Sequence, residues 1–392
     1  MNVLVLQCGG PTAVVNASLS GAIDQSRNQR SVKRLWGARR GFQGLITGDW
    51  IDLTDYRDRG ARRLELQSGA ALGSGRTPLR NEDLPVVWRH LDERDIRAAL
   101  IIGGNGSMAA AESLSKGAIA AGYPLQVIGI PKTIDNDIAG TDASPGYGSA
   151  ARFIAQSVHD AGLDLSAMRD FDDVVLFEVM GRYSGWLAAA SSLARWNESA
   201  VPHLILLPEI LLDENAFIAA LEHWHRRKGV CMVVVAEGAR DRDGAFLAER
   251  YRKAERDGSG QKLLGFAGGP APYLAQFVRE RLELRCRQVR PETIQRSSAA
   301  LASEVDRGLA RQVGEDAVKA ALEGQSGIMI ALARTGNGWR SMFVSLDQVA
   351  GRERTLPPDF IDAMNFDVTP RFTAYARPLI GDWSPGAIDL ES

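Results

Sequence analysis

The stretch Ala98-Ala99-Leu100-Ile101-Ile102-Gly103-Gly104-Asn105-Gly106-Ser107 is an apolar run that ends in a glycine-rich loop. A continuous apolar run without polar alternation is typical of a strand that is covered on both faces, as in a parallel sheet. The residues that follow, 108–121, have the periodicity of a helix. The order of strand, glycine loop and helix predicts one βα unit of a doubly wound fold.

The same pattern recurs along the chain. Further apolar runs lie at 3–6, 127–130, 174–179, 204–207 and 230–236. Further helical periodicity lies at 17–29, 183–195 and 215–227. The repetition predicts an α/β fold with two Rossmann-like lobes and mainly parallel sheets, in which the loops at the carboxyl edges of the strands bind ligands.

Composition narrows the class of protein further. The chain has 392 residues, of which 45% are apolar, and 46 Lys and Arg nearly balance 48 Asp and Glu. This balance disfavours a general nucleic-acid binder, and no apolar run approaches the roughly 20 residues that span a bilayer. The three cysteines form no CxxC pair, and the residues after Met1 show no basic region or cleavage site, so we expect no signal peptide. We therefore expect a cytoplasmic protein whose partners include neither nucleic acid nor a membrane.

The loop at 103–107 is the first candidate for a ligand site. A glycine loop that opens a helix offers backbone N–H groups to an anion, although a plain tight turn would look similar. Gly104, Gly106 and Ala109 also match the GxGxxA dinucleotide fingerprint, which keeps an NADP-dependent oxidoreductase as an alternative. That fingerprint also needs an acidic residue at the end of the next strand, to bind the ribose. Here the next strand ends at Pro131-Lys132, so this acidic residue is missing.

The segment 131–137 is the second candidate. Lys132, Asp135 and Asp137 lie within a few residues directly after an apolar run. In phosphoryl transfer one carboxylate can take a hydroxyl proton, another can support Mg²⁺, and a lysine can neutralise phosphate charge. The alternative is a solvated turn, since Asp and Asn are ordinary turn residues.

Several segments together resemble the 6-phosphofructokinase family in order and spacing, over roughly residues 1–335. They are Gly9-Gly10-Pro11, 72–76, 103–107, 131–137, 178–182, Glu237-Gly238 and 294–296. ATP-dependent members usually carry glycine at the position of Lys132. In having a lysine there, this chain resembles the branch of the family that uses pyrophosphate. The resemblance implies an Mg²⁺-dependent enzyme that phosphorylates the 1-hydroxyl of fructose 6-phosphate to give fructose 1,6-bisphosphate.

The resemblance also implies a domain organisation. Residues 1–146 with about 295–345 would form the lobe that binds the phosphoryl donor. Residues of about 147–294 would bind the sugar phosphate, with the active site in the cleft between the lobes. Residues of about 346–392 would form a C-terminal wrapping segment.

The resemblance assigns roles to individual residues. Asp135 would be the general base, Asp137 would support Mg²⁺ and that base, and Lys132 would bind the donor. Thr133 and Arg182 would stabilise the charge of the transferred group. The donor would also contact Gly10, Arg76, Gly104, Asn105, Gly106 and Ser107, with Asn105 facing the metal. The sugar phosphate would contact Thr133, Asp135, Met180, Gly181, Arg182, Glu237, Arg287, Thr293 and Arg296. Arg287 would reach it from a neighbouring subunit, which implies a homodimer or homotetramer.

Four positions differ from the family pattern and leave alternatives open. Asn105 stands where many members have an aspartate. Gly106 stands where pyrophosphate-dependent members usually have an aspartate that would repel ATP. An ATP-dependent 6-phosphofructokinase therefore remains the alternative function. Asp173 replaces an arginine and Thr293 an aromatic residue or histidine. The acceptor could then be a related sugar such as sedoheptulose 7-phosphate, or the protein could be a sensor without catalysis.

Overall fold

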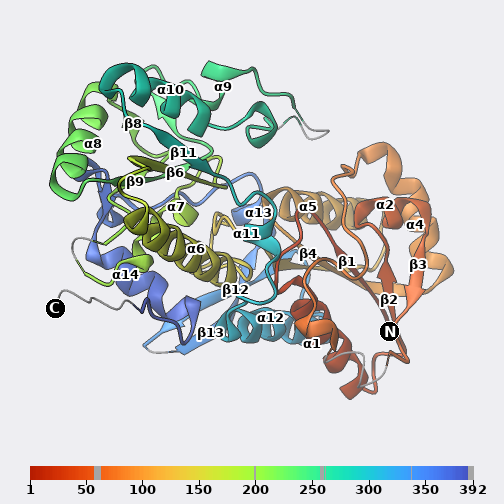
Figure 1. Ribbon diagram of the computed structural model, residues 1–392. Coiled ribbons are helices and arrows are strands. Elements are labelled where there is room, and N and C mark those ends of the chain that lie inside the picture. The colour runs from red at the N-terminus through yellow and green to blue at the C-terminus, as the bar shows by residue number, and fades with distance from the viewer. Residues whose placement is uncertain (57–62, 198–199, 257–259, 261, 337, 387–392) are drawn as a thin grey trace. The chain divides into compact units, whose positions relative to one another are not determined.

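The computed structural model describes residues 1–392 except 57–62, 198–199, 257–259, 261, 337 and 387–392 (Figure 1). Contacts divide the chain into two units, residues 1–149 with 296–354 and residues 150–295 with 355–392. Each unit is built around its own sheet. Within the described ranges no helix is long and apolar enough to cross a membrane.

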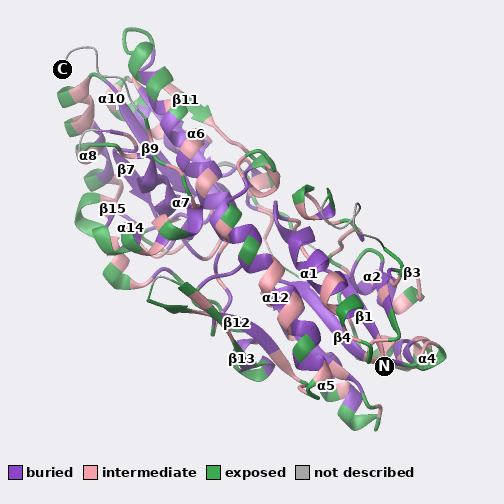
Figure 2. Cartoon of the chain, turned by 90° about the horizontal axis from the view of Figure 1, so that it is seen from below, coloured by how far each residue is buried: buried purple, intermediate pink, exposed green. Residues whose placement is uncertain are grey.

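The first unit contains a seven-stranded sheet in the order β13-β12-β5-β4-β1-β2-β3. Its strands are β1 (Asn2–Gln7), β2 (Arg34–Ala38), β3 (Trp50–Asp52), β4 (Ile96–Gly103), β5 (Gln126–Pro131), β12 (Ile328–Thr335) and β13 (Gly338–Ser345). The pairs β2–β3 and β12–β13 are antiparallel, and the other pairs are parallel. The central strands β1 and β4 are buried along almost their whole length, as Figure 2 shows. This burial explains their continuous apolar sequence.

Helices cover both sides of this sheet and connect its strands. They are α1 (Val15–Asn28), α2 (Phe42–Thr47), α4 (Leu84–Glu93), α5 (Asn105–Ala120), α12 (Glu304–Leu322) and α13 (Leu346–Val349). Helix α5 directly follows β4, and α1 and α12 pack side by side (Figure 1). The helix predicted at 108–121 is therefore confirmed, with its first turn formed by the glycine loop itself.

The second unit contains a parallel sheet in the order β11-β6-β9-β7. Its strands are β6 (Val174–Val179), β7 (Leu204–Leu206), β9 (Cys231–Ala236) and β11 (Cys286–Val289). Two small pairs join β8 (Leu211–Leu212) to β10 (Arg240–Asp241) and β14 (Ile361–Asp362) to β15 (Asp367–Val368). The predicted α/β class with mainly parallel sheets is thus confirmed.

The helices of the second unit are mostly short. They are α7 (Trp186–Ala190), α8 (Glu214–Lys228), α9 (Ala248–Tyr251), α10 (Ala271–Leu282) and α14 (Pro370–Ala376), and α6 (Tyr147–Ala167) and α11 (Ile294–Ser297) include residues of both units. The bounds of α8 have a clear local cause. The Asp213 carboxylate accepts the N–H groups of Asn215 and Ala216 at 3.0 and 3.2 Å, and Gly229 ends the helix in the left-handed region.

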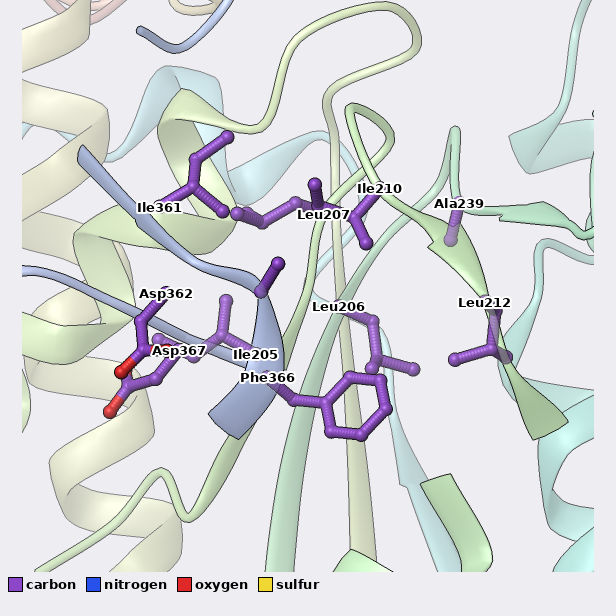
Figure 3. Close-up of a pocket in the computed structure, with 11 residues that line it drawn as sticks. Ile205, Leu206, Leu207, Ile210, Leu212, Ala239, Ile361, Asp362, Phe366 and Asp367 are labelled. Carbon is purple, nitrogen blue, oxygen red and sulfur yellow. The ribbon is translucent and has the colours of Figure 1, made fainter. Parts of the chain in front are cut away.

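A cavity lies between β7 and the chain that carries β14 and β15 (Figure 3). Its walls are mostly apolar, with the carboxylates of Asp362 and Asp367 at one side. Asp367 is paired with Arg195 at 2.8 Å. None of the predicted site residues lines this cavity.

Candidate functional site

Three loops of the first unit meet at one edge of its sheet. Strand β4 pairs with both β1 and β5, so the residues that follow these strands are neighbours. The Cys8 N–H donates to Ile102 O at 2.8 Å, and the Lys132 N–H donates to Gly103 O at 2.9 Å. These bonds bring together the predicted loops after β1, β4 and β5, as expected for the carboxyl edge of a parallel sheet.

Lys132 is a buried lysine at the centre of this edge. Its Nζ donates a hydrogen bond to the carbonyl oxygen of Gly10 at 2.6 Å. Burial lowers the pKa of Lys132 to about 8, with Arg296 and Arg76 lowering it further and Asp135 opposing them. The ammonium is thus held at the glycine loop of β1 in surroundings that make its charge less favourable than in water, and a bound anion would offset this cost.

The N-terminus of α5 forms the second side of this edge. Gly104 precedes the helix and accepts the N–H groups of Ser107 and Met108 at 2.9 and 3.0 Å. The N-terminus of a 16-residue helix carries partial positive charge and attracts phosphate. Gly106 is exposed, and a Cβ added there would meet no heavy atom within 4 Å.

Asn105 and Asp137 form a pair beside this helix start. The Asn105 amide nitrogen donates to the Asp137 carboxylate at 2.8 Å and to its carbonyl oxygen at 3.2 Å. Burial raises the pKa of Asp137, and this hydrogen bond opposes the rise. Within the described chain, the remaining oxygens, Asn105 Oδ1 and Asp137 Oδ1, are buried and accept no hydrogen bond.

These two oxygens suit a hard cation. Mg²⁺ prefers oxygen ligands and is usually held by one or two protein groups together with water and substrate phosphates. Among the described residues no cluster of three or more His, Cys, Asp or Glu could enclose a metal ion by itself. Asn105 and Asp137 therefore fit an Mg²⁺ ion that is bound jointly with a phosphate substrate.

The loop between Lys132 and Asp137 is fixed by buried polar contacts. Asn136 adopts a φ of 51°, which asparagine tolerates, and its Oδ1 accepts the Ser144 N–H at 3.0 Å. The Thr133 N–H donates to Pro145 O at 3.2 Å, and buried Asp306 in turn accepts the N–H of Gly146 at 3.0 Å. The backbone on both sides of Asp135 is thus anchored.

Arg76 and Arg296 are the remaining predicted site residues that belong to the first unit. The Gly9 N–H donates to Gly75 O at 3.1 Å, and Gly9 O accepts from Ser74 Oγ, which places Arg76 beside the β1 loop. A Cβ added at Gly10 would lie 2.9 Å from Nη1 of Arg296. Arg296, predicted from the sequence to bind the sugar phosphate, is therefore found among the predicted donor residues.

The second unit brings together another group of predicted residues. The Glu237 N–H donates to Val179 O at 2.8 Å and the Gly238 N–H to Gly181 O at 3.1 Å, which joins the loops after β6 and β9. Burial raises the pKa of Glu237, and the charge of Arg182 opposes the rise. Met180, Gly181, Arg182 and Glu237 are thereby neighbours at the carboxyl edge of the second sheet.

Arg287 is opposite Val175 near the start of β6, away from that group, whereas Thr293 lies two residues before Gln295, whose Oε1 accepts the Met180 N–H at 2.9 Å. Arg287, on β11, forms a two-point contact with buried Asp172, with Nε–Oδ2 and Nη2–Oδ1 distances of 3.0 and 2.9 Å. Thr293 is exposed and directly precedes α11. Asp173, which replaces a family arginine, accepts the Arg285 Nε–H at 2.9 Å. Arg285 and Arg287 are therefore both paired with aspartates of the same unit.

A buried carboxylate that was not predicted from the sequence supports the loop after β6. Glu178 Oε1 accepts from Nε of Arg290 at 3.1 Å, and its Oε2 accepts the Ala271 N–H at 3.1 Å. Gly269 approaches so closely that a Cβ there would lie 1.9 Å from Oε1. A glutamate in the middle of an apolar run, two residues before Met180, was the signal that could have identified it.

Glu178 predicts a pH dependence of stability. Burial raises its pKa from 4.5 to about 7. The folded protein therefore keeps this proton up to about pH 7, whereas the unfolded chain loses it near pH 4.5. The contribution of Glu178 to the free energy of unfolding is therefore largest below pH 4.5. It falls by roughly 3 kcal/mol as the pH rises from 4.5 through 7.

Denaturant unfolding at several pH values measures this effect. We expect the decline between pH 4.5 and 7 to become shallower in Glu178→Gln, because glutamine has no proton to lose. Glu292→Gln is the matched control, since Glu292 contacts the same Arg290 at 3.1 Å but is exposed. Equal slopes in the wild-type protein and Glu178→Gln would contradict the assignment.

Comparisons with known proteins agree with these features. The family model described as phosphofructokinase matches residues 2–321. The pyrophosphate–fructose 6-phosphate 1-phosphotransferase of Xanthomonas campestris is 38% identical over 98% of this chain and 92% of its own length. The sulfofructose kinase of Alkalicoccus urumqiensis is 35% identical over 100% of this chain and 96% of its own length.

A solved structure shows the same fold. The pyrophosphate-dependent phosphofructokinase of Nitrosospira multiformis superposes with a TM-score of 0.89 at 32% sequence identity, covering 100% of this chain and 94% of its own. The family model, the relatives and this structure span the strand-end loops of both units. The chain belongs to the phosphofructokinase family.

Proposed function

We propose that this protein transfers a phosphoryl group from pyrophosphate to the 1-hydroxyl of fructose 6-phosphate, giving fructose 1,6-bisphosphate and orthophosphate. The observation that carries the proposal is the position of Lys132, which is buried with its Nζ on Gly10 O where the loops of β1, β4 and β5 meet. The relative named as a pyrophosphate–fructose 6-phosphate 1-phosphotransferase, similar over nearly the whole chain, supports the same donor and acceptor.

Asp135 acts as the general base. Its carboxylate takes the proton of the 1-hydroxyl while the hydroxyl oxygen attacks the terminal phosphorus of pyrophosphate. The bond from that phosphorus to the bridging oxygen breaks, and orthophosphate leaves with the electron pair. Such proton transfer typically contributes about 10²- to 10⁴-fold to the rate. The anchored loop around Asp135 fixes its position before the substrate binds.

Charge stabilisation supplies the rest of the rate enhancement. Lys132, Arg76 and the N-terminus of α5 bind donor phosphates, and Thr133 and Arg182 are assigned to the transferred group. Asn105 and Asp137 would hold Mg²⁺, which neutralises charge on the phosphate oxygens when it is bound. The main work of these residues is positioning and electrostatics, as is usual for phosphoryl transfer.

The acceptor is assigned to the loops of the second unit. Met180, Gly181 and Glu237 position the sugar, and Arg287 binds its 6-phosphate from a neighbouring copy of the chain. This last assignment makes a homodimer or homotetramer part of the proposal. A cytoplasmic location is also part of it, in keeping with three cysteines that are all free.

Gly106 allows the choice of donor to be tested by a substitution. Because no heavy atom lies within 4 Å of a Cβ at this position, Gly106→Asp fits without rearrangement. We expect turnover with pyrophosphate to fall less than turnover with ATP, because pyrophosphate has no nucleotide part to meet the new carboxylate. Any turnover with ATP should fall at least about tenfold, because the new carboxylate repels the longer nucleotide. An equal loss with both donors would contradict this reading.

A second acceptor is suggested by one observation. Arg287 and Arg285 are already paired with Asp172 and Asp173, which reduces the positive charge available to the acceptor's anion. A sulfonate carries one negative charge, fewer than an ionised phosphate. A sulfonated fructose is therefore the alternative acceptor, and the relative named sulfofructose kinase favours the same alternative.

A coupled assay tests both choices together. The wild-type protein is supplied with Mg²⁺, with pyrophosphate or ATP as donor, and with fructose 6-phosphate or its 6-sulfonate analogue as acceptor. The proposal predicts the highest kcat/KM for pyrophosphate with fructose 6-phosphate. A preference for the sulfonate would reassign the acceptor, and turnover with ATP alone would reassign the donor.

A further inference from the structure

The loop that follows β6, residues 180–185, ends on a carboxylate from another part of the chain. We refer to it as the acceptor loop. The Gly185 N–H at its end donates to Oε1 of Glu209 at 2.9 Å, and Glu209 lies in the segment between β7 and β8. A Cβ added at Gly185 would lie 2.7 Å from Oε2 of Glu209. Glycine at this position therefore leaves room for the carboxylate to reach the backbone of the loop.

The same carboxylate oxygen also binds the C-terminal segment, which is residues 355–386. The Leu356 N–H donates to Oε1 of Glu209 at 2.9 Å, and both residues belong to the second unit. Burial raises the pKa of Glu209, and the N–H groups of Gly185 and Leu356 oppose the rise. One oxygen atom thus ties the end of the acceptor loop to the start of the C-terminal segment.

A second contact joins the C-terminal segment to the chain directly after the acceptor loop. Trp186 is fully buried and begins α7. The centroid of its ring system lies 5.1 Å from that of Tyr375, 6.0 Å from that of Phe360 and 6.3 Å from that of Phe372. Aromatic pairs at such separations attract one another beyond the apolar area that they bury. Helix α14, which carries two of these rings, accordingly packs against α7.

The beginning of the acceptor loop is held by other contacts of the second unit. The Met180 N–H donates to Oε1 of Gln295 at 2.9 Å, and the Gly238 N–H donates to Gly181 O at 3.1 Å. A Cβ at Gly238 would lie 1.9 Å from the carbonyl oxygen of Arg182, so the backbone there is closely packed. Arg182 therefore lies between two fixed ends of the loop, of which the later one depends on Glu209 and the C-terminal segment.

We propose that Glu209 and the C-terminal segment position Arg182 for the reaction by fixing the end of the acceptor loop. The inference rests on the proposed function, in which this loop binds the sugar and Arg182 meets the transferred group. Glu209 acts through the backbone of Gly185, so it is a positioning residue and not a catalytic one. The C-terminal segment lies beyond residues 2–321, which the family model matches.

Steady-state kinetics of Glu209→Ala tests the proposal. The substitution removes the acceptor of both N–H groups, and a hydrogen bond to a charged group typically changes an equilibrium by about 10- to 100-fold. A loop that is only partly in its binding conformation binds its ligand more weakly in proportion. We therefore expect the KM of fructose 6-phosphate to rise roughly 10-fold or more and kcat to fall, whereas the KM of pyrophosphate should change far less. Glu209→Gln should stay close to wild type, because its amide oxygen can still accept both N–H groups.

Two further variants separate positioning from general stability. Asp367→Asn is the matched control, because Asp367 ties the same C-terminal segment to Arg195 at 2.8 Å, beyond α7. It should lower the unfolding temperature and leave both KM values unchanged. Tyr375→Ala removes one of the rings on Trp186 and should raise the KM of the sugar as Glu209→Ala does. It serves if Glu209→Ala does not fold.

Hydrogen–deuterium exchange without substrates measures the tie itself. Glu209→Ala should speed exchange roughly tenfold or more in the peptides that contain Gly185 and Leu356. Asp367→Asn should leave the peptide of Gly185 unchanged. Unchanged exchange at Gly185 in Glu209→Ala, or an equal rise of both KM values, would overturn the proposal alone. A wild-type protein that transfers no phosphoryl group to the sugar would overturn it together with the proposed function.

Discussion

Asp135→Asn is expected to lower kcat by about 10²- to 10⁴-fold, because asparagine cannot accept the proton of the attacking hydroxyl. The KM values should change far less, since the loop is held by contacts that do not involve the Asp135 carboxylate. These contacts are the Asn136 Oδ1 bond to Ser144 and the Thr133 bond to Pro145. Initial rates at saturating pyrophosphate and fructose 6-phosphate measure the effect.

Asp142→Asn is the matched control for this prediction. Asp142 lies on the same segment, is exposed, and accepts the Arg334 N–H at 2.8 Å at the sheet edge. Its turnover should remain within a few-fold of wild type, and both variants should unfold at similar temperatures. An Asp135→Asn protein that keeps near-normal kcat would remove Asp135 from the role of base.

Lys132→Met should lower kcat/KM for pyrophosphate by on the order of 10²-fold. The substitution removes a charge-assisted contact to the donor, worth about 1.5–3 kcal/mol, together with the bond to Gly10 O. Methionine has similar length and suits a buried position, so the variant should fold. In the free protein the lowered pKa of Lys132 means that its charged form destabilises the fold at neutral pH. The free energy of unfolding should therefore increase as the pH rises from about 8 towards 10.5.

The pH profile distinguishes a binding role of Lys132 from a structural one. In the wild-type protein the affinity for pyrophosphate should weaken as the pH rises above about 8, because the lysine then loses its charge before the donor binds. The decline should disappear in Lys132→Met. The control is Lys116→Met on α5, which removes an exposed lysine paired with Glu112 at 2.6 Å and should leave kcat/KM and the profile unchanged. A Lys132→Met protein with the wild-type profile would contradict the role.

The sequence was sufficient to predict six of the strands, β1, β4, β5, β6, β7 and β9, and the loops that follow them. Strands buried on both faces need continuous apolar residues, and β1, β4, β6 and β9 have them. Strand β11, Cys286–Val289, was not predicted, because it carries an arginine and a glutamine at the edge of its sheet. The β12–β13 pair was also missed, since β13 is an edge strand with mostly exposed or half-buried residues.

The site was only partly predictable for a similar reason. Lys132, Asp135 and Asp137 are adjacent in the sequence, so their shared chemistry could be recognised locally. The family resemblance assigned Arg296 to the sugar phosphate, but only the folded chain shows it beside Gly10. The support of the loop by buried Asp306 depends in the same way on a contact between distant segments.

Synthesis of pyrophosphate in the reverse direction tests the central claim most directly. The protein is incubated with Mg²⁺, fructose 1,6-bisphosphate and orthophosphate, and the phosphorus NMR spectrum is followed over time. Transfer from pyrophosphate predicts that a pyrophosphate signal and fructose 6-phosphate appear in equal amounts. No pyrophosphate signal, from a protein that makes fructose 1,6-bisphosphate when given ATP, would contradict it.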